Sequence, residues 1–294
     1  MESEERRGPG RSDPNHGPRT GAEHRKHALV LARDIGFVDT RIVSQMLWPD
    51  DSNARKYAER LLSRLSKEQV LLRRPLDRKS GIFVLTKAGA FEVGSRPQTQ
   101  WGRHLKGELG DRWLPPTTFV HDRRAAWFGC WMARFGWRPV FERQYRDGAS
   151  DQNVPDCLLV DPAGEAVWVE VENSQKNSAD REEQIEGAIR RFHKPRKMDT
   201  PWGLVTVRRT IWVLPPQGWK DSRGYAIDHE PALRREWAAA LAAHIKSAKA
   251  SAEFDRRSLA EIAAAGLPWR SVKASVWRET TIGFEKAVSL SFAD

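Results

Sequence analysis

The stretch VPDCLLVDPAGEAVWVEVE, residues 154–172, contains two apolar runs separated by the tight-turn sequence DPAG. Two neighbouring strands joined by so short a turn are expected to pair as a hairpin. Because side chains alternate along a strand, Trp168, Glu170 and Glu172 share one face of the second strand. Asp156 lies on the paired strand. The sequence therefore predicts that two or three carboxylates converge on this hairpin.

Converging carboxylates predict a metal site. Like charges repel one another unless a cation neutralises them, and hard oxygen ligands suit Mg²⁺ or Mn²⁺. Such an ion would polarise a phosphodiester and lower the pKa of a bound water. Asp156 and Glu170 are the candidate ligands, and Glu142, on the preceding expected strand, is a candidate to join or support them. The alternative is that these acids are only the solvated face of a hairpin.

The residues around the hairpin alternate between helical and strand-like patterns. Helices are expected at 123–135 and 179–192, and strands at 138–146 and 210–216. This order predicts a mixed α/β (α+β) layer with helices on the faces of the sheet. Trp127, Trp131 and Phe135 recur every four residues and are expected in the core. His121, before the first helix, is interpreted as a structural residue.

The sequence past Trp219 is less informative. Pro231 opens an alanine-rich helix, and a short helical pattern at 258–266 precedes a strand-like stretch at 271–284. These segments are compatible with an extension of the α/β layer, with a third small subdomain and with a dimer surface.

The N-terminal part of the chain has a different pattern. Residues 1–21 are polar and carry charges of both signs, which predicts a flexible tail. Three short helical patterns follow from Ala22, with Asp39 as the expected N-cap of the second helix. Asp51 or Ser52 is the expected N-cap of the third.

A basic hairpin is expected next, because the stretch VLLRRPLDRKSGIFVLT alternates and breaks between Pro75 and Gly81. Three helices followed by a basic hairpin is the order of a winged helix-turn-helix domain. We therefore expect this domain at residues 22–95, a polar interdomain linker at 96–116 and the α/β domain at 117–294.

Charge supports a polyanionic partner, since the chain carries a formal net charge of +10. Between Ser52 and Lys87 there are ten basic residues and three acids. A helix that enters the major groove needs cations to meet phosphates, and a basic wing tip can straddle the adjacent backbone. The candidate contacts to double-stranded DNA are Asn53, Arg55, Lys56, Arg60, Arg64, Arg73, Arg74, Arg78 and Lys79. A solvated helix face and a protein-binding winged helix are the alternatives.

Other classes of protein are excluded by composition. No apolar run approaches the length of a membrane span, so no membrane partner is expected, and no secretory signal is recognisable. The two cysteines, Cys130 and Cys157, are too few and too far apart for a disulfide scaffold or a cysteine-based zinc finger. The expected location is the cytoplasm.

The hairpin also resembles a known superfamily. Pro155-Asp156, followed after fourteen residues by Glu170-Val171-Glu172, is similar to the PD-(D/E)XK nucleases, with Glu172 where a lysine usually stands. The resemblance implies a restriction-endonuclease-like fold, with Asp156, Glu170 and the main-chain carbonyl of Val171 as metal ligands. It also implies that Glu172 helps to position water and that Lys176 supplies a displaced positive charge.

A closer resemblance covers roughly residues 22–216. The winged helix, the His-Asp pair at 121–122, and the motifs WRP, PDCLLV and VEVENSQK occur in the order of the plasmid replication-relaxation family. The resemblance implies a DNA-binding protein of a plasmid or integrative element, with a Mg²⁺- or Mn²⁺-dependent endonuclease activity that nicks or cleaves DNA, and a homodimer is a candidate assembly. The alternative is a non-catalytic replication or mobilisation regulator with a degenerate nuclease fold.

Overall fold

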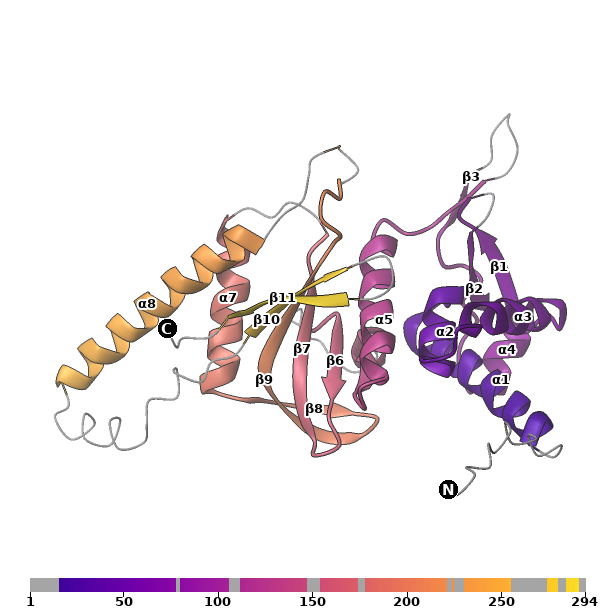
Figure 1. Ribbon diagram of the computed structural model, residues 1–294, viewed down its shortest axis with the longest axis horizontal. Helices are drawn as coiled ribbons and strands as arrows, with labels where there is room; N and C mark the ends of the chain where they lie inside the picture. The colour runs from indigo at the N-terminus through magenta and orange to yellow at the C-terminus, as the bar shows by residue number, and fades with distance from the viewer. Residues whose placement is uncertain are drawn as a thin grey trace, which may run out of the picture. The chain divides into compact units, whose positions relative to one another are not determined.

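The computed structural model describes residues 16–77, 80–105, 112–146, 154–173, 178–220, 224, 230–254, 274–279 and 284–290. This described part is mixed α/β, with eight helices and a curled mixed sheet (Figure 1). The chain divides into two compact units, residues 1–113 and 114–294.

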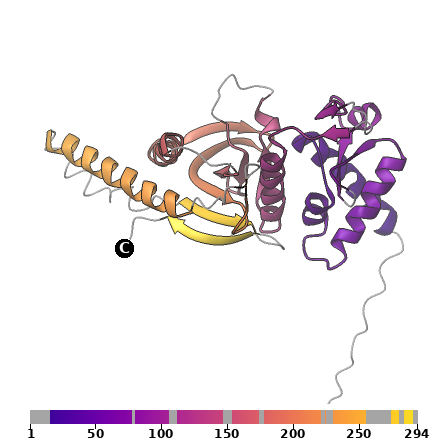
Figure 2. The same ribbon diagram turned by 90° about the horizontal axis from the view of Figure 1, so that it is seen from above.

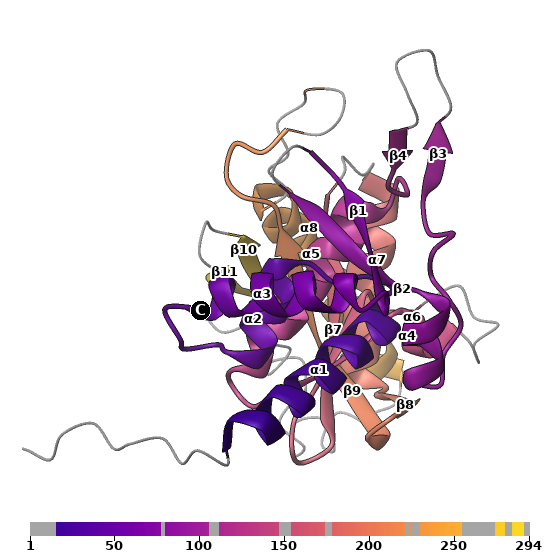
Figure 3. The same cartoon turned by 90° about the vertical axis from the view of Figure 1, so that its right-hand side faces the viewer.

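The N-terminal unit consists of helices and a hairpin (Figure 3). Its main elements are α1 (His16–Ile35), α2 (Thr40–Leu47), α3 (Ala54–Lys67), β1 (Leu71–Pro75), β2 (Gly81–Leu85) and α4 (Lys87–Glu92). Strands β1 and β2 pair antiparallel, as the alternating pattern predicts, and Val38 adds an isolated bridge to Phe83 of β2. Helix α3 turns Ala58, Leu61, Leu62 and Leu65 into the core, which leaves its charged side chains exposed.

The helix caps of this unit agree with the sequence in one case and differ in another. Asp39 caps α2 as predicted, because its Oδ1 accepts the N–H of Ile42 at 2.8 Å. Neither Asp51 nor Ser52 is the N-cap of α3; Asn53 occupies that position. The carboxylate of Asp51 instead accepts the Asn53 N–H at 2.7 Å, which closes the turn before the helix.

Two boundaries of the N-terminal unit differ from the prediction. Helix α1 already begins at His16, within the expected tail, and residues 1–15 lie outside the described residues. The expected linker at 96–116 packs in large part onto the unit itself. Trp101 stacks on Phe37 at 4.9 Å between ring centroids, and Gln98 is buried and donates to the Arg33 carbonyl at 3.2 Å. Strands β3 (Arg103–Leu105) and β4 (Arg112–Leu114) form a small sheet of their own.

The second unit contains a seven-stranded sheet with helices on both sides (Figures 1 and 2). Its helices are α5 (Phe119–Ala133), α6 (Arg143–Arg146), α7 (Ser178–His193) and α8 (Glu230–Phe254). Its strands are β5 (Arg138–Phe141), β6 (Cys157–Val160), β7 (Glu165–Val171), β8 (Arg196–Thr200), β9 (Gly203–Leu214), β10 (Ala274–Glu279) and β11 (Phe284–Leu290).

The topology of this sheet places the hairpin near its centre. The strand order is β11-β10-β9-β7-β6-β5, and β8 pairs with β9 beside this path. Strands β5, β6 and β7 form an antiparallel meander, whereas β7, β9 and β10 run parallel. Helix α7 lies in the crossover from β7 to β9, and its Ile185, Ala188 and Ile189 are buried. The predicted layer of alternating helices and strands is therefore present.

Two local predictions in the second unit are wrong. The strand expected at 138–146 ends at Phe141, because the chain turns into α6. Gln144 stabilises that turn by accepting the Phe141 N–H at 2.8 Å. Trp127 and Trp131 are buried as expected, but Phe135 lies beyond the end of α5 and is 57% exposed. The helical pattern at 258–266 lies outside the described residues.

Candidate carboxylate site and cationic helix

Asp156 and Glu170 lie opposite each other across the β6–β7 hairpin. Cys157 pairs with Val169, so the antiparallel register sets Asp156 against Glu170. The main-chain N–H of Asp156 donates to the Val169 carbonyl at 3.1 Å, and its Oδ2 accepts the Val171 N–H at 2.6 Å. The contact between Val171 and Asp156 is therefore made by the main-chain N–H of Val171, whereas the resemblance implies a role for its main-chain carbonyl. The structure brings these two carboxyl groups, fourteen residues apart in the chain, to one face of one hairpin.

Burial makes the charge on Glu170 unfavourable. Its desolvation, together with the negative charges of Asp156 and Glu172, raises the pKa of Glu170 to about 8. The Trp168 indole N–H donates to Glu170 Oε1 and, with the positive charge of Arg191, opposes this increase. Without a further cation, Glu170 is mostly protonated at neutral pH.

His121 is the residue that the sequence interpretation missed. It lies in the first turn of α5, and its Nε2 is 3.1 Å from Asp156 Oδ2 while its Nδ1 is 3.3 Å from Asp122 Oδ1. Burial disfavours the imidazolium, but hydrogen bonds to Asp122 and Asp156 outweigh it and raise the pKa of His121 to about 10. His121 is therefore a cation at neutral pH. The adjacent His-Asp pair was the available signal, but only the fold brings it to Asp156.

Helix α7 adds a second cation on the Glu170 face. The Arg191 guanidinium lies 4.1 Å from the centroid of the Trp168 ring and donates to Thr210 Oγ1 at 3.3 Å. Thr210 is the partner of Trp168 on β9. Burial lowers the pKa of Arg191 to about 10, so its charge is kept at neutral pH. Arg191 lies in the basic run RRFHKPRK, residues 190–197, and nothing in that run connects it with Glu170.

The other predicted catalytic residues are Glu172, Glu142 and Lys176, and of these Glu172 is near enough for its charge to act on Glu170. Glu172 follows β7, is 1% exposed and donates its main-chain N–H to the Val213 carbonyl. Glu142 begins the turn into α6, where its carbonyl accepts the Tyr145 N–H at 3.0 Å. Lys176 lies outside the described residues, as do Arg78 and Lys79.

Asp156 and Glu170 are the two candidate oxygen ligands for a metal ion at this site. No group of three His, Cys, Asp or Glu side chains suited to a metal ion occurs in the described part of the chain. The chemistry of Asp156 and Glu170 nevertheless fits a divalent cation, because an ion between them would relieve the repulsion that raises the pKa of Glu170. Asp156 Oδ2 already accepts from Val171 and faces His121, so Oδ1 is the oxygen better placed to serve as a ligand.

The cationic face of α3 is the second candidate site. Asn53, Arg55, Lys56, Arg60 and Arg64 are all exposed along it, and Arg73 is exposed on β1. Part of the charge is compensated within the unit. Arg55 pairs with Glu59 at 3.1 Å, and Arg64 approaches Glu68 at 3.7 Å.

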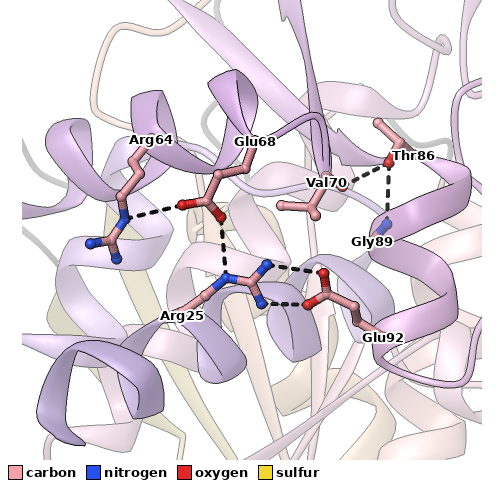
Figure 4. A network of polar contacts seen from close by, with 7 residues as sticks. All are labelled: Arg25, Arg64, Glu68, Val70, Thr86, Gly89 and Glu92. Carbon is pink, nitrogen blue, oxygen red and sulfur yellow. Dashed lines mark hydrogen bonds and ion pairs between the residues drawn. The ribbon is translucent and has the colours of Figure 1, made fainter. Parts of the chain in front are cut away.

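Glu68, at the C-terminal end of α3, is part of a network of ion pairs (Figure 4). Arg25 of α1 contacts Glu68 at 3.2 Å and forms a two-pronged ion pair with Glu92 of α4. The hydrogen bonds from Arg25 lower the pKa of Glu92. Arg25 thus ties α1 to both α3 and α4 and fixes α3 within the unit.

Arg74 differs from the other predicted DNA contacts. Its side chain is half-buried, donates to the Thr99 carbonyl at 2.6 Å and lies 6.0 Å from the Trp113 ring. Burial lowers its pKa. Arg74 therefore holds Thr99 and Trp113 against the hairpin, and we give it a structural role in place of the predicted DNA contact.

Comparisons with protein-family models, curated protein sequences and solved structures found no match for this chain. No helix in the described part of the chain has the length and apolarity that a membrane span requires.

Proposed function

We propose that this chain is a DNA-binding protein whose second unit carries a divalent-metal-dependent site for phosphodiester hydrolysis. The observation that carries the proposal is the pairing of Asp156 with Glu170 across β6 and β7. A hard cation between the two carboxylates, supplied as Mg²⁺ or Mn²⁺, would polarise the phosphate and lower the pKa of a water. The order of strands around the pair is compatible with the PD-(D/E)XK fold that the sequence resembles.

The chain's own cations complement such a site. A lysine normally balances the charge that develops during phosphoryl transfer, and Glu172 stands in its place. The imidazolium of His121 holds Asp156 in position from α5, and Arg191 lies on the Glu170 face. These two groups supply the positive charge that the motif itself lacks.

Duplex DNA is the proposed partner of the N-terminal unit. Its order of three helices and a hairpin suits a winged helix-turn-helix, in which α3 enters the major groove and the β1–β2 hairpin flanks it. The exposed side chains of Asn53, Arg55 and Lys56 in the first turns of α3 are the proposed groove contacts. Arg60, Arg64 and Arg73 are proposed to meet phosphates.

A nicking assay on supercoiled plasmid with Mg²⁺ or Mn²⁺ tests the hydrolytic activity. We expect Asp156→Ala and Glu170→Ala to abolish nicking by the full chain. Glu165→Gln is the matched control, because Glu165 lies on the same strand but is half exposed and pairs with Arg208 at 3.8 Å. Absence of nicking by the wild type would reject the activity. Nicking by the two alanine variants at the wild-type rate would reject the assignment of the activity to this site.

Duplex binding is tested separately by fluorescence anisotropy in buffer without divalent ions. Replacing Arg55, Lys56 and Arg60 together by glutamine is expected to weaken binding and to lower the salt slope by about one for each phosphate that the variant no longer neutralises. Lys87→Gln is the control, because Lys87 is an exposed cation of the same unit outside α3. Equal effects of the two variants would show that α3 is not the binding surface.

A non-catalytic DNA-binding regulator is the second candidate. It is favoured by the glutamate in the lysine position and by the lack of a three-residue metal group among the described residues. Thermal melting with added Mn²⁺ separates the two candidates, since an ion that binds only the folded protein raises the melting temperature by mass action. A shift that disappears in Asp156→Ala supports the metal site, and no shift supports the regulator.

A further inference from the structure

The second unit exposes a group of aromatic and apolar side chains away from the carboxylates. Phe135 is 57% exposed, Trp202 54% and Leu204 61%. Two guanidinium groups lie against the rings: Arg134 is 5.4 Å from the Phe135 centroid and Arg138 is 5.3 Å from the Trp202 centroid. We call these five residues the aromatic patch.

The backbone around Trp202 is held by hydrogen bonds. Trp202 lies in the turn between β8 and β9, where its main-chain N–H donates to Thr200 Oγ1 at 3.1 Å. The same hydroxyl donates to the Gly203 carbonyl at 2.8 Å. Gly203 has a φ of +98°, which suits glycine. The turn therefore presents the indole ring to solvent from a defined position.

The sheet brings the two parts of the patch together. Phe135 and Arg138 flank the turn from α5 into the edge strand β5, whereas Trp202 and Leu204 come from the β8–β9 hairpin, much later in the chain. The sheet curls so that this hairpin turn reaches the edge strand, as the Arg138–Trp202 contact requires (Figure 1). Helix α5 has 15 residues and is therefore about 22 Å long, which separates Phe135 from His121 and the carboxylates.

We propose that the aromatic patch binds single-stranded DNA, with bases stacked on Trp202 and Phe135 and phosphates contacting Arg134 and Arg138. Exposed aromatic rings beside cations are the usual means of binding unpaired strands, because every base has a face that can stack. Duplex DNA cannot stack its bases on these rings, because the bases are already stacked on one another inside the double helix. Isolated apolar residues are common on protein surfaces, but here each of the two exposed rings has a guanidinium group within 5.4 Å of its centroid, and Arg138 links the ring of Trp202 to the segment that carries Phe135.

The local charge agrees with a polyanionic strand. Arg134 and Arg138 are exposed, and Lys197 is an exposed cation on β8, while Asp199 on the same strand is an exposed acid. The resulting excess of positive charge attracts phosphates and repels a basic partner. The proposal goes beyond the duplex-binding and hydrolytic functions above and depends on neither of them.

The test measures binding of the full chain to a fluorescent oligothymidylate at low salt with a metal chelator present, so that no hydrolysis intervenes. Stacking on one aromatic side chain predicts that Trp202→Ala weakens binding at least about fivefold. Trp202→Phe keeps a ring and is expected to retain most of the affinity. Phe91→Ala is the matched control, because Phe91 is an 88% exposed ring on α4 of the other unit.

Further measurements exclude the competing explanations. Affinity for duplex DNA is expected to be unchanged in Trp202→Ala, and Arg138→Gln is expected to lower the salt slope for the single strand by about 0.7. Equal single-strand binding by the wild type and Trp202→Ala overturns the proposal, as does the absence of single-strand binding by the wild type. The oligomeric state of the wild type and of Trp202→Ala is measured by sedimentation. If the wild type is a dimer and Trp202→Ala is a monomer, the patch is an interface between two copies of the chain, and the single-strand proposal is overturned.

Discussion

The α3 face and the β6–β7 hairpin hold their charges in opposite ways. On α3, Arg55 and Lys56 are exposed, and the Arg55–Glu59 ion pair is open to solvent, which screens it. On the hairpin, Glu170 is buried against Asp156, and His121 pairs with Asp156 in turn. The comparison teaches that loss of one charge on α3 has a small, graded effect. Loss of one charged side chain near the hairpin alters the electrostatic environment of the others, so the protonation of Glu170 and His121 is expected to change together.

The largest expected effect comes from Gly89→Ala, which would break the N-terminal unit alone. A Cβ at this position would lie 2.1 Å from the Val70 carbonyl oxygen, so the main chain of Val70, just before β1, or that of α4 must move. We expect a loss of at least about 4 kcal/mol of stability, because the added Cβ overlaps main-chain atoms that cannot rotate away, and a loss of duplex binding; both are read from the melting transition of this unit and from anisotropy. Gly21→Ala is the control, with nothing within 4 Å of the added Cβ. Wild-type melting of Gly89→Ala would contradict the close approach.

A buried ion pair in the second unit is expected to have the next largest effect. Arg181 of α7 and Glu236 of α8 lie 2.9 Å apart, with 13% and 10% of their side chains exposed. Glu236→Gln removes the carboxylate charge that faces the buried Arg181 guanidinium, at an expected cost of about 3 kcal/mol in chemical unfolding. Glu59→Gln, which breaks the exposed pair with Arg55, is expected to cost no more than about 0.5 kcal/mol. If Glu236→Gln and Glu59→Gln cost similar amounts of stability, the contrast between a buried ion pair in the second unit and an exposed one on α3 would be wrong.

The pH dependence of stability sharpens the comparison at the hairpin. The pKa of Glu170 in the folded protein is raised to about 8 from an ordinary 4.5, so the folded state binds the proton more tightly than the unfolded state. The free energy of unfolding should therefore fall as the pH rises from about 4.5 to about 8, by up to about 4 kcal/mol from this group. Glu170→Gln should flatten this slope in metal-free denaturant titrations, while Glu165→Gln keeps it. A slope that is unchanged in Glu170→Gln would exclude Glu170 as its source.

The smallest effects distinguish two neighbours on β1. Arg73 is exposed, so Arg73→Gln is expected to lower the salt slope of duplex binding by about one and to leave stability within about 0.5 kcal/mol of the wild type. Arg74 donates to the Thr99 carbonyl, so Arg74→Gln is expected to cost about 1 kcal/mol of stability and to leave the salt slope unchanged. The reverse outcome would return Arg74 to the DNA-binding face.

Local patterns predicted much of the fold. The β6–β7 hairpin, the β1–β2 hairpin and the Asp39 cap each depend on residues close together in the chain, and each is present. The errors occur where a distant segment competes with the local pattern. The 96–113 segment has the composition of a linker, but Trp101 has Phe37 to stack on, and the strand expected beyond Phe141 gives way to α6.

For the candidate site, the sequence by itself determined that Asp156 and Glu170 face each other, because alternation along two strands joined by a tight turn leaves a single register. Only the tertiary structure decided that His121 and Arg191 supply charge beside them, and that Trp202 meets Arg138. These contacts join α5, α7 and β8–β9 to strands distant in the chain. Burial and side-chain proximity, which shift each pKa, arise from packing between elements and have no counterpart in the spacing of residues along the sequence.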